Sequence, residues 1–273
     1  MRLFRPLQPP ILQHGLIDSN YRYREYLPSK SLEPYIACYW TVEFNASHTD
    51  KLHRIIPDGC VDIIFDLKAS SLSKGAFATG LMTQFEVITL SQNCSLFGIR
   101  FFIDTAHLFF TYPVSEFIGN HVFLEDIWGN DSAYLVEDIL SSTRISEIIE
   151  KVESRLLKFL LLNETKTDDL LETSMQYMFF HKGMISIRTL SEELSYSERH
   201  LRRRFQKELG VSPKELLSII RFQSLLQELY LKPQFHFSDI SLKYGYYDQP
   251  HFIKSFKYLY GISPSKIFKS DPH

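Results

Sequence analysis

The stretch DQPHFIKSFKYLYGISPS, Asp248–Ser265, repeats the pattern of SERHLRRRFQKELGVSPK, Ser197–Lys214, which lies 51 residues earlier in the chain. An internal repeat of this kind predicts two copies of one structural unit. The two copies share a histidine, a phenylalanine and a glycine that opens a Gly-x-Ser-Pro end: His200 and His251, Phe205 and Phe256, Gly210 and Gly261.

Each copy has the signals of a helix, a tight turn and a second helix. The expected signals, in chain order, are an N-cap serine (Ser186, Ser238), a turn (Ser195-Tyr196, Gly245-Tyr246), a glycine stop (Gly210, Gly261) and a Ser-Pro start of a further helix (Ser212-Pro213, Ser263-Pro264). Serine hydroxyls accept hydrogen bonds from free N–H groups at helix starts, and glycine favours the left-handed backbone at helix ends. The pattern predicts two helix-turn-helix units, in which the second helix can enter a DNA major groove.

The second helix of each unit separates an apolar face from a polar one. At about 100° per residue, Leu201 and Phe205 share one face, as do Phe252 and Phe256, and these faces predict the core. Arginine and glutamine suit contacts to base edges, and lysine suits phosphate contacts. The expected DNA-facing residues are Arg199, Arg202, Arg203 and Gln206 in the first copy, and Gln249, Pro250, Ile253, Lys254 and Lys257 in the second.

The segment between the two units supports this interpretation. A helix from Pro213 to about Tyr230 has 18 residues, which makes it about 27 Å long. Such a helix can hold two recognition helices roughly one turn of DNA apart, about 34 Å. A charged surface on an ordinary helical bundle is the alternative, which two in-phase copies disfavour.

Charge is distributed unevenly, although the net charge of the 273 residues is only -2. Residues 184–270 hold 14 Lys and Arg against 8 Asp and Glu, whereas the rest holds 16 against 24. A basic C-terminal third on an acidic remainder indicates a module that binds a polyanion. Chance clustering of charge is the other explanation.

At these residues the chain resembles the AraC/XylS family of bacterial transcription regulators. The resemblance covers about Asp169–Phe268, and its signature is Gly245–Phe252 with the Gly-Ile-Ser-Pro end. It implies a seven-helix domain whose two helix-turn-helix units bind double-stranded promoter DNA, with the family's base-contacting positions at Arg199, Arg202, Arg203, Gln206, Gln249, Pro250, Ile253 and Lys254. RNA polymerase is a further candidate partner. Phe268 departs from the family, which usually has an arginine near this point.

Residues 21–103 are expected to be rich in β-strands. Runs of β-branched and aromatic residues, separated by polar or glycine-containing segments, predict strands at Ala37–Phe44, Lys51–Ile56, Val61–Leu67, Ala76–Gly80, Phe85–Leu90 and Leu96–Phe102. Six or more short strands at this spacing indicate a sandwich or a small barrel.

Helical patterns follow at residues 132–142 and 144–162, and a polar, acidic break lies at 164–170. The fold class is therefore α+β, with a β-rich domain and its connecting helices at 1–163 and an all-α domain at 164–273. The apolar stripe of residues 144–162 packs within its own domain or pairs with a second subunit in a homodimer.

Residues 21–160 resemble, more weakly, one class of N-terminal domain found in such regulators. The matching motifs are Pro34-Tyr35 through Tyr39-Trp40, Pro57-Asp58-Gly59-Cys60 with Asp62, Gly98-Ile99-Arg100-Phe101 and Leu124-Glu125-Asp126-Ile127-Trp128-Gly129. The resemblance implies a sensing or association role with an unspecified small-molecule effector. Arg100 interrupts an apolar strand, so it needs a carboxylate partner or a ligand. The candidate effector-binding residues are Trp40, Asp58, Asp62 and Arg100. The segment Pro57-Asp58-Gly59 also fits an ordinary β-turn.

Other classes of function find little support. The sequence has no Gly-x-Ser-x-Gly or phosphate-binding loop and no Cys-x-x-Cys or His-x-His, so no enzyme activity, metal site or cofactor is expected. No apolar run reaches the ~18 residues of a membrane span. Three cysteines without close spacing suit the reducing cytoplasm. The alternative function is a small-molecule-binding or enzymatic β domain with a helical tail for protein contacts.

Overall fold

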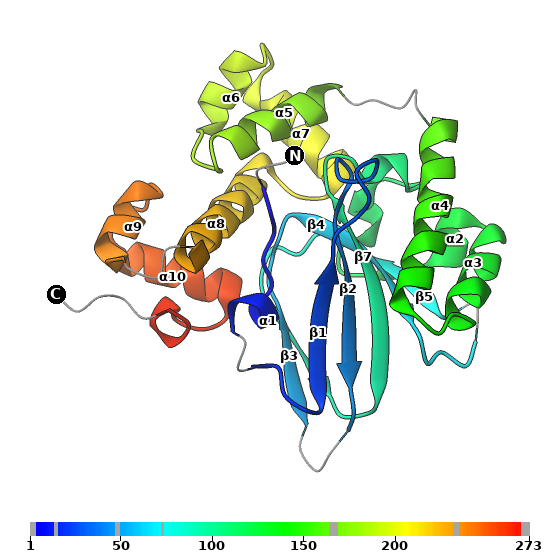
Figure 1. The fold of residues 1–273 in the computed structure, drawn as a ribbon. Helices are drawn as coiled ribbons and strands as arrows, with labels where there is room; N and C mark the ends of the chain where they lie inside the picture. The colour runs from blue at the N-terminus through cyan, green and yellow to red at the C-terminus, as the bar shows by residue number, and fades with distance from the viewer. Residues whose placement is uncertain are drawn as a thin grey trace.

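A computed structural model describes residues 4–13, 16–46, 50–71, 74–163, 169–231 and 235–268. The N-terminal half is built around antiparallel strands and the C-terminal half is helical, as the sequence predicts (Figure 1). The described strands are β1 (Tyr21–Tyr26), β2 (Ile36–Phe44), β3 (Lys51–Ile55), β4 (Cys60–Asp66), β5 (Ala76–Thr79), β6 (Glu86–Leu90), β7 (Cys94–Phe102) and β8 (His121–Phe123).

The strands form two sheets. Six of them pair in the order β1-β2-β7-β4-β5-β8, and β3 pairs with β6 in a separate ribbon. The ribbon covers one face of the larger sheet, where the Tyr21 hydroxyl lies 2.7 Å from Nδ1 of His53. Tyr21, Trp40 and Leu90 accordingly share one apolar cluster. The β-rich domain is therefore sandwich-like on this side.

Helices cover the opposite face of the larger sheet (Figure 1). Tyr39 of β2 points to that face, where its hydroxyl donates to Oε1 of Glu153 in α4. The helical elements between β7 and residue 163 are η2 (Ala106–Leu108), η3 (Val114–Phe117), α2 (Leu124–Trp128), α3 (Asp131–Leu140) and α4 (Ile145–Asn163). The two helices predicted from residues 132–142 and 144–162 correspond to α3 and α4.

The C-terminal half contains seven helical elements among its described residues. They are α5 (Asp169–Phe180), α6 (Ile187–Glu193), α7 (Glu198–Leu209), α8 (Pro213–Leu231), α9 (Phe237–Lys243), α10 (Gln249–Tyr260) and the single 3-10 turn η4 (Pro264–Lys266). Of the break expected at 164–170, residues 164–168 lie outside the described residues, and Asp169 already belongs to α5. None of the helices in the described ranges has the length and hydropathy needed to cross a membrane.

Two helix starts differ from expectation. Ser238 is not the N-cap of α9, because the helix begins at Phe237 and His236 occupies the capping position. Phe237, the first residue of this helix, is buried in the second unit's core. Ser263 does precede a helical turn, but η4 has three residues only.

The segment before β1 joins the two halves. It contains α1 (Pro9–Leu12) and runs between the sheet and α8 (Figure 1). The ring of Phe4 packs on Phe179 of α5, with 4.6 Å between their centroids. Leu7 and Leu12 pack against the apolar cluster that contains α10. The β-rich and helical domains are therefore in close contact along this segment.

Candidate nucleic-acid interface

The first helix-turn-helix unit consists of α6 and α7. Ser186 caps α6 by accepting from the backbone N–H of Thr189, as predicted. Ser195 turns the chain with a φ of 56°. Ser197 then caps α7 by accepting from the N–H of His200 at 3.2 Å. These caps fix where both helices begin, so the orientation of α7 is set by local hydrogen bonds.

The helix α7 has the two faces that the sequence predicts. Leu201 and Phe205 are completely buried. Arg204, which lies between the faces, makes an ion pair with Glu208, with 3.2 Å between Nη1 and Oε1. The amide of Gln206 donates to the carbonyl of Gly210 at 2.9 Å, so this side chain caps the end of its own helix. The predicted DNA-facing residues Arg199, Arg202, Arg203 and Gln206 are all exposed.

The second unit, α9 and α10, repeats this arrangement. Gly245 turns the chain with a φ of 68°. Asp248, the counterpart of Ser197, caps α10 by accepting from the N–H of His251 at 2.7 Å. Ile253 is half-buried against the second unit's core, unlike the other residues predicted for this face. The predicted DNA-facing residues of α10 that are exposed are Gln249, Pro250, Lys254 and Lys257.

The connecting helix α8 has 19 residues, Pro213–Leu231, and is therefore about 28 Å long. Its start is a reciprocal cap: Ser212 Oγ accepts from the N–H of Glu215, whose carboxylate accepts from the N–H of Ser212. Ile220 joins the core of the first unit and Phe222 that of the second. The helix thus joins the cores of the two units.

Phe268, where the family resemblance leads one to expect arginine, is part of the second unit's core. It packs against the cluster that contains Phe252 and Phe256, and its ring lies 6.3 Å from that of Phe235. This chain therefore has apolar packing where the family resemblance leads one to expect a polar contact.

The four candidate effector-binding residues come together between the two sheets. Arg100 is 3% exposed and pairs with three carboxylates, Asp58 at 3.0 Å, Asp62 at 3.2 Å and Glu25 at 3.8 Å. Asp62 lies directly across from Arg100 in the β4–β7 register. The ring of Trp40 lies across Gly98, where an added Cβ would be 2.0 Å from it. The sequence predicts either a carboxylate partner or a ligand for Arg100, and the structure shows carboxylates.

Burial changes the titration of this cluster. It raises the pKa of Asp62 to about 6, against the opposing attraction of Arg100. Burial and the nearby charge of Arg100 lower the pKa of His53 to about 4. His53 is therefore held neutral beside the cluster at physiological pH.

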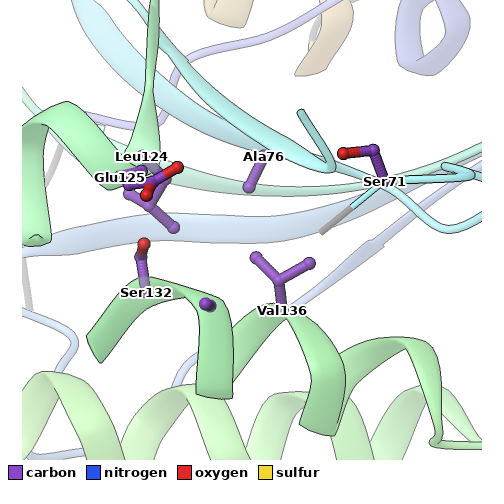
Figure 2. Close-up of a pocket in the computed structure, with 7 residues that line it drawn as sticks. Ser71, Ala76, Leu124, Glu125, Ser132 and Val136 are labelled. Atoms are coloured by element: carbon purple, nitrogen blue, oxygen red, sulfur yellow. The ribbon is translucent and has the colours of Figure 1, made fainter. Parts of the chain in front are cut away.

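Two hollows on the β-rich domain lie away from this cluster. One, with a volume of about 360 Å³, lies between β5, the start of α2 and α3 (Figure 2). Another, of about 440 Å³, lies along α3 and α4. Neither is lined by Trp40, Asp58, Asp62 or Arg100.

Two buried glutamines, which sequence analysis missed, connect the cluster to α8. The amide of Gln8 donates to Oδ2 of Asp58 at 2.8 Å, and also pairs with the backbone of Ile56. Gln223 of α8 donates to the carbonyl of Pro57 at 2.7 Å. The one available signal was Gln223 itself, a polar residue on the otherwise apolar side of a predicted helix.

Comparison with known families matches two parts of the chain. Residues 190–270 match a helix-turn-helix domain, and residues 24–123 match a domain of unknown function, DUF6597. An uncharacterized HTH-type transcriptional regulator of Haemophilus influenzae is 37% identical over 84 residues, 31% of this chain. The chain spans 28% of the length of that relative.

Solved structures of ToxT from Vibrio cholerae are similar over most of the chain. One, at 1.65 Å resolution, shares 14% identity and covers 92% of this chain and 100% of its own, with a TM-score of 0.42. Another, ToxT of strain SCE256 with a bound unsaturated fatty acid, shares 16% identity and covers 93% and 99%, with a TM-score of 0.42.

The helix-turn-helix match begins in α6 and extends past η4, so it includes both units described above. The other match begins in β1 and ends with β8, the last strand of the larger sheet. The chain thus carries an AraC-type helix-turn-helix domain, joined to a β-rich domain of the DUF6597 family.

Proposed function

We propose that this chain is a sequence-specific DNA-binding transcription regulator of the cytoplasm rather than an enzyme. The observation that carries the proposal is the repeated unit: two capped recognition helices, α7 and α10, are joined by one continuous helix. Each presents exposed cations, among them Arg199, Arg202 and Arg203 on α7 and Lys254 and Lys257 on α10. Such side chains neutralise phosphates and contact base edges.

Selection from a random duplex library tests the proposal. The full-length chain is incubated with random 40-base-pair DNA, bound duplexes are recovered and amplified, and the cycle is repeated. A regulator of this kind enriches one motif with two half-sites about one helical turn apart, roughly 10 base pairs. A pool that stays random after several cycles contradicts the proposal.

The β-rich domain is the proposed regulatory part. An effector or a partner there would shift the equilibrium between arrangements of the two units, which is the minimum requirement for coupling between sites. The cluster of Trp40, Asp58, Asp62 and Arg100 remains our candidate for the responding site, because Gln8 and Gln223 connect it to α8. Mass spectrometry of gently purified protein tests for a retained small molecule, and a spectrum containing the bare chain alone counts against a resident effector.

RNA polymerase and a second copy of the chain are the further proposed partners. The C-terminal end of α4 supports self-association, because Leu161 and Leu162 there are largely exposed. Sedimentation equilibrium of the wild type and of Leu161→Glu measures the oligomeric state. A monomer at all concentrations contradicts the homodimer.

A further inference from the structure

Both recognition helices end against the β-rich domain, and they do so at equivalent positions of the repeat. Each helix stops at a glycine with left-handed backbone, Gly210 with a φ of 71° and Gly261 with a φ of 89°. A Cβ added to Gly210 would lie 2.4 Å from Ile118. A Cβ added to Gly261 would lie 2.5 Å from Arg54. The β-rich domain therefore closely approaches the same corner of both units.

A hydrogen bond to a helix-end carbonyl accompanies each approach. Ser115 of η3 donates its hydroxyl to the carbonyl of Lys207 in α7 at 2.7 Å. Arg54 of β3 donates from Nη1 to the carbonyl of Tyr260 in α10 at 2.8 Å. Carbonyls in the last turn of a helix lack intrahelical partners, and a cation there also interacts favourably with the helix dipole.

The arginine is itself held in place. Its guanidinium lies over the ring of Phe85, 5.5 Å from the centroid, and the same ring is 2.6 Å from the Cβ position of Gly261. The Arg54 backbone pairs with Val87 in the β3–β6 ribbon. The contact to α10 thus comes from an arginine side chain whose position is fixed by Phe85 and by the pairing of its strand.

The cores of the two helix-turn-helix units are separate, so the contacts of the β-rich domain with the helix ends can affect the angle between α7 and α10. Leu201 and Phe205 of the first unit belong to the large cluster shared with the β-rich domain. Phe252 and Phe256 belong to a second cluster, to which the β-rich domain contributes Ile56. Besides α8, the β-rich domain is therefore the body that both units contact, and it can set the angle between α7 and α10.

The contacts leave the proposed DNA-facing side chains accessible. Lys207 and Tyr260 lie in the last turns of their helices, whereas Arg199, Arg202 and Gln249 lie in the first halves and are exposed. The same helix can therefore be held at one end and contact DNA at the other.

Resting on the proposed function, we propose that the β-rich domain positions the two recognition helices for simultaneous binding, and that Ser115 and Arg54 are the positioning residues. Neither belongs to the side chains that we propose contact DNA. Each fixes a helix end, so that both helices meet their half-sites without further reorganisation. Losing either contact should weaken binding to two half-sites and leave binding to one half-site unchanged.

The test uses the full-length chain and the duplex that it selects from random DNA. Fluorescence anisotropy compares this duplex with one in which a half-site is scrambled. Ser115→Ala, which changes no charge, should weaken binding to the intact duplex roughly tenfold, as expected for one lost hydrogen bond to a helix end. Arg54→Ala should do the same, and neither should change binding to the scrambled duplex.

Two control variants separate geometry from charge and from folding. Arg24→Ala removes the same charge from an exposed position on β1, and Ser154→Ala removes an exposed hydroxyl from α4. Both should bind the intact duplex like the wild type. Circular dichroism melts of Ser115→Ala confirm that the chain is folded.

The outcomes distinguish this proposal from the proposed function. If Ser115→Ala and Arg54→Ala bind both duplexes like the wild type, or lose affinity equally for both, the positioning role is wrong. A wild type that selects a motif but binds the intact and scrambled duplexes equally would also contradict the positioning role. If the wild type itself selects no motif, the proposed function fails instead.

Discussion

The side-chain amide of Gln223 pairs with both backbone groups of Leu7, 216 positions away in the sequence. Its Oε1 accepts from the Leu7 N–H at 2.8 Å, and its Nε2 donates to the Leu7 carbonyl at 3.2 Å and to the Pro57 carbonyl. Gln223 is 0% exposed. A glutamine in the middle of the connecting helix thus binds the N-terminal segment and the β3–β4 turn to the helical domain.

Replacing Gln223 by leucine should lower the free energy of unfolding by about 2–4 kcal/mol. The substitution leaves the buried carbonyl of Pro57 without this partner, at a cost of about 1–3 kcal/mol, and the partly buried N–H and carbonyl of Leu7 add a smaller cost. Urea denaturation followed by circular dichroism measures the change. Gln227→Leu, a turn further along the same helix, loses one hydrogen bond to the carbonyl of Arg5 at an exposed site. It should cost much less, and an equal loss in the two variants would count against this account.

Removing the charge of Arg100 should destabilise the β-rich domain strongly. In Arg100→Met the carboxylates of Asp58 and Asp62 remain buried without their cation, and breaking a buried pair in this way costs about 3–5 kcal/mol. The free energy of unfolding at pH 7 measures the loss.

The double variant Arg100→Met/Asp62→Asn is the matched comparison. Because it also removes one of the uncompensated charges, it should recover part of the lost stability. A double variant that is less stable than Arg100→Met would show that the pair does not act as described.

Acid should weaken the fold through His53. Its folded pKa of about 4 lies below the ordinary value of 6.5, so between these values the unfolded chain binds a proton that the folded chain excludes. The contribution of His53 to the free energy of unfolding should therefore fall as the pH decreases from 6.5 to 4, by at most about 1.4 kcal/mol per pH unit, whereas Asp62, whose folded pKa is raised to about 6, should act in the opposite direction. Urea titrations of the wild type and of His53→Gln check this, and parallel pH profiles of the two would contradict the assignment. The imidazole NMR signals should also show a neutral ring at pH 5.

Arg203→Ala should weaken binding to the selected DNA by about 1–3 kcal/mol and relax the preference at one base pair. Arg203 is exposed on the side of α7 that we propose faces DNA. Anisotropy titrations against duplexes changed at single positions measure the preference, with Arg24→Ala as the charge control. Equal losses on every duplex would mean that this arginine contacts phosphate only.

The local features of the fold were predictable because they depend on short-range patterns. The six predicted strands correspond to β2 through β7, since runs of β-branched and aromatic residues mark buried strands. The strand β1 was missed, although Tyr21 and Tyr23 alternate with the exposed Arg22 and Arg24, which is itself a strand signal. The strand β8 has three residues, too few for any periodicity.

Contacts between distant segments were not predictable from one sequence. Arg100 was recognisable as a residue in need of a partner, but its pairing with Asp58 depends on how the β3–β4 turn lies beside β7. Gln206 satisfied the helical-face pattern, and yet its amide caps α7 in this structure. The contacts of Ser115 and Arg54 with helix ends carry no local signal, because both residues are ordinary in their own segments.

The central claim is that α7 and α10 bind one face of a single duplex, and helical phasing tests it most directly. Five base pairs inserted between the half-sites of the selected duplex rotate one half-site by about half a turn, to the opposite face. The account predicts that affinity falls to that of a duplex with one half-site, as measured by anisotropy. Unchanged affinity after the insertion would contradict it.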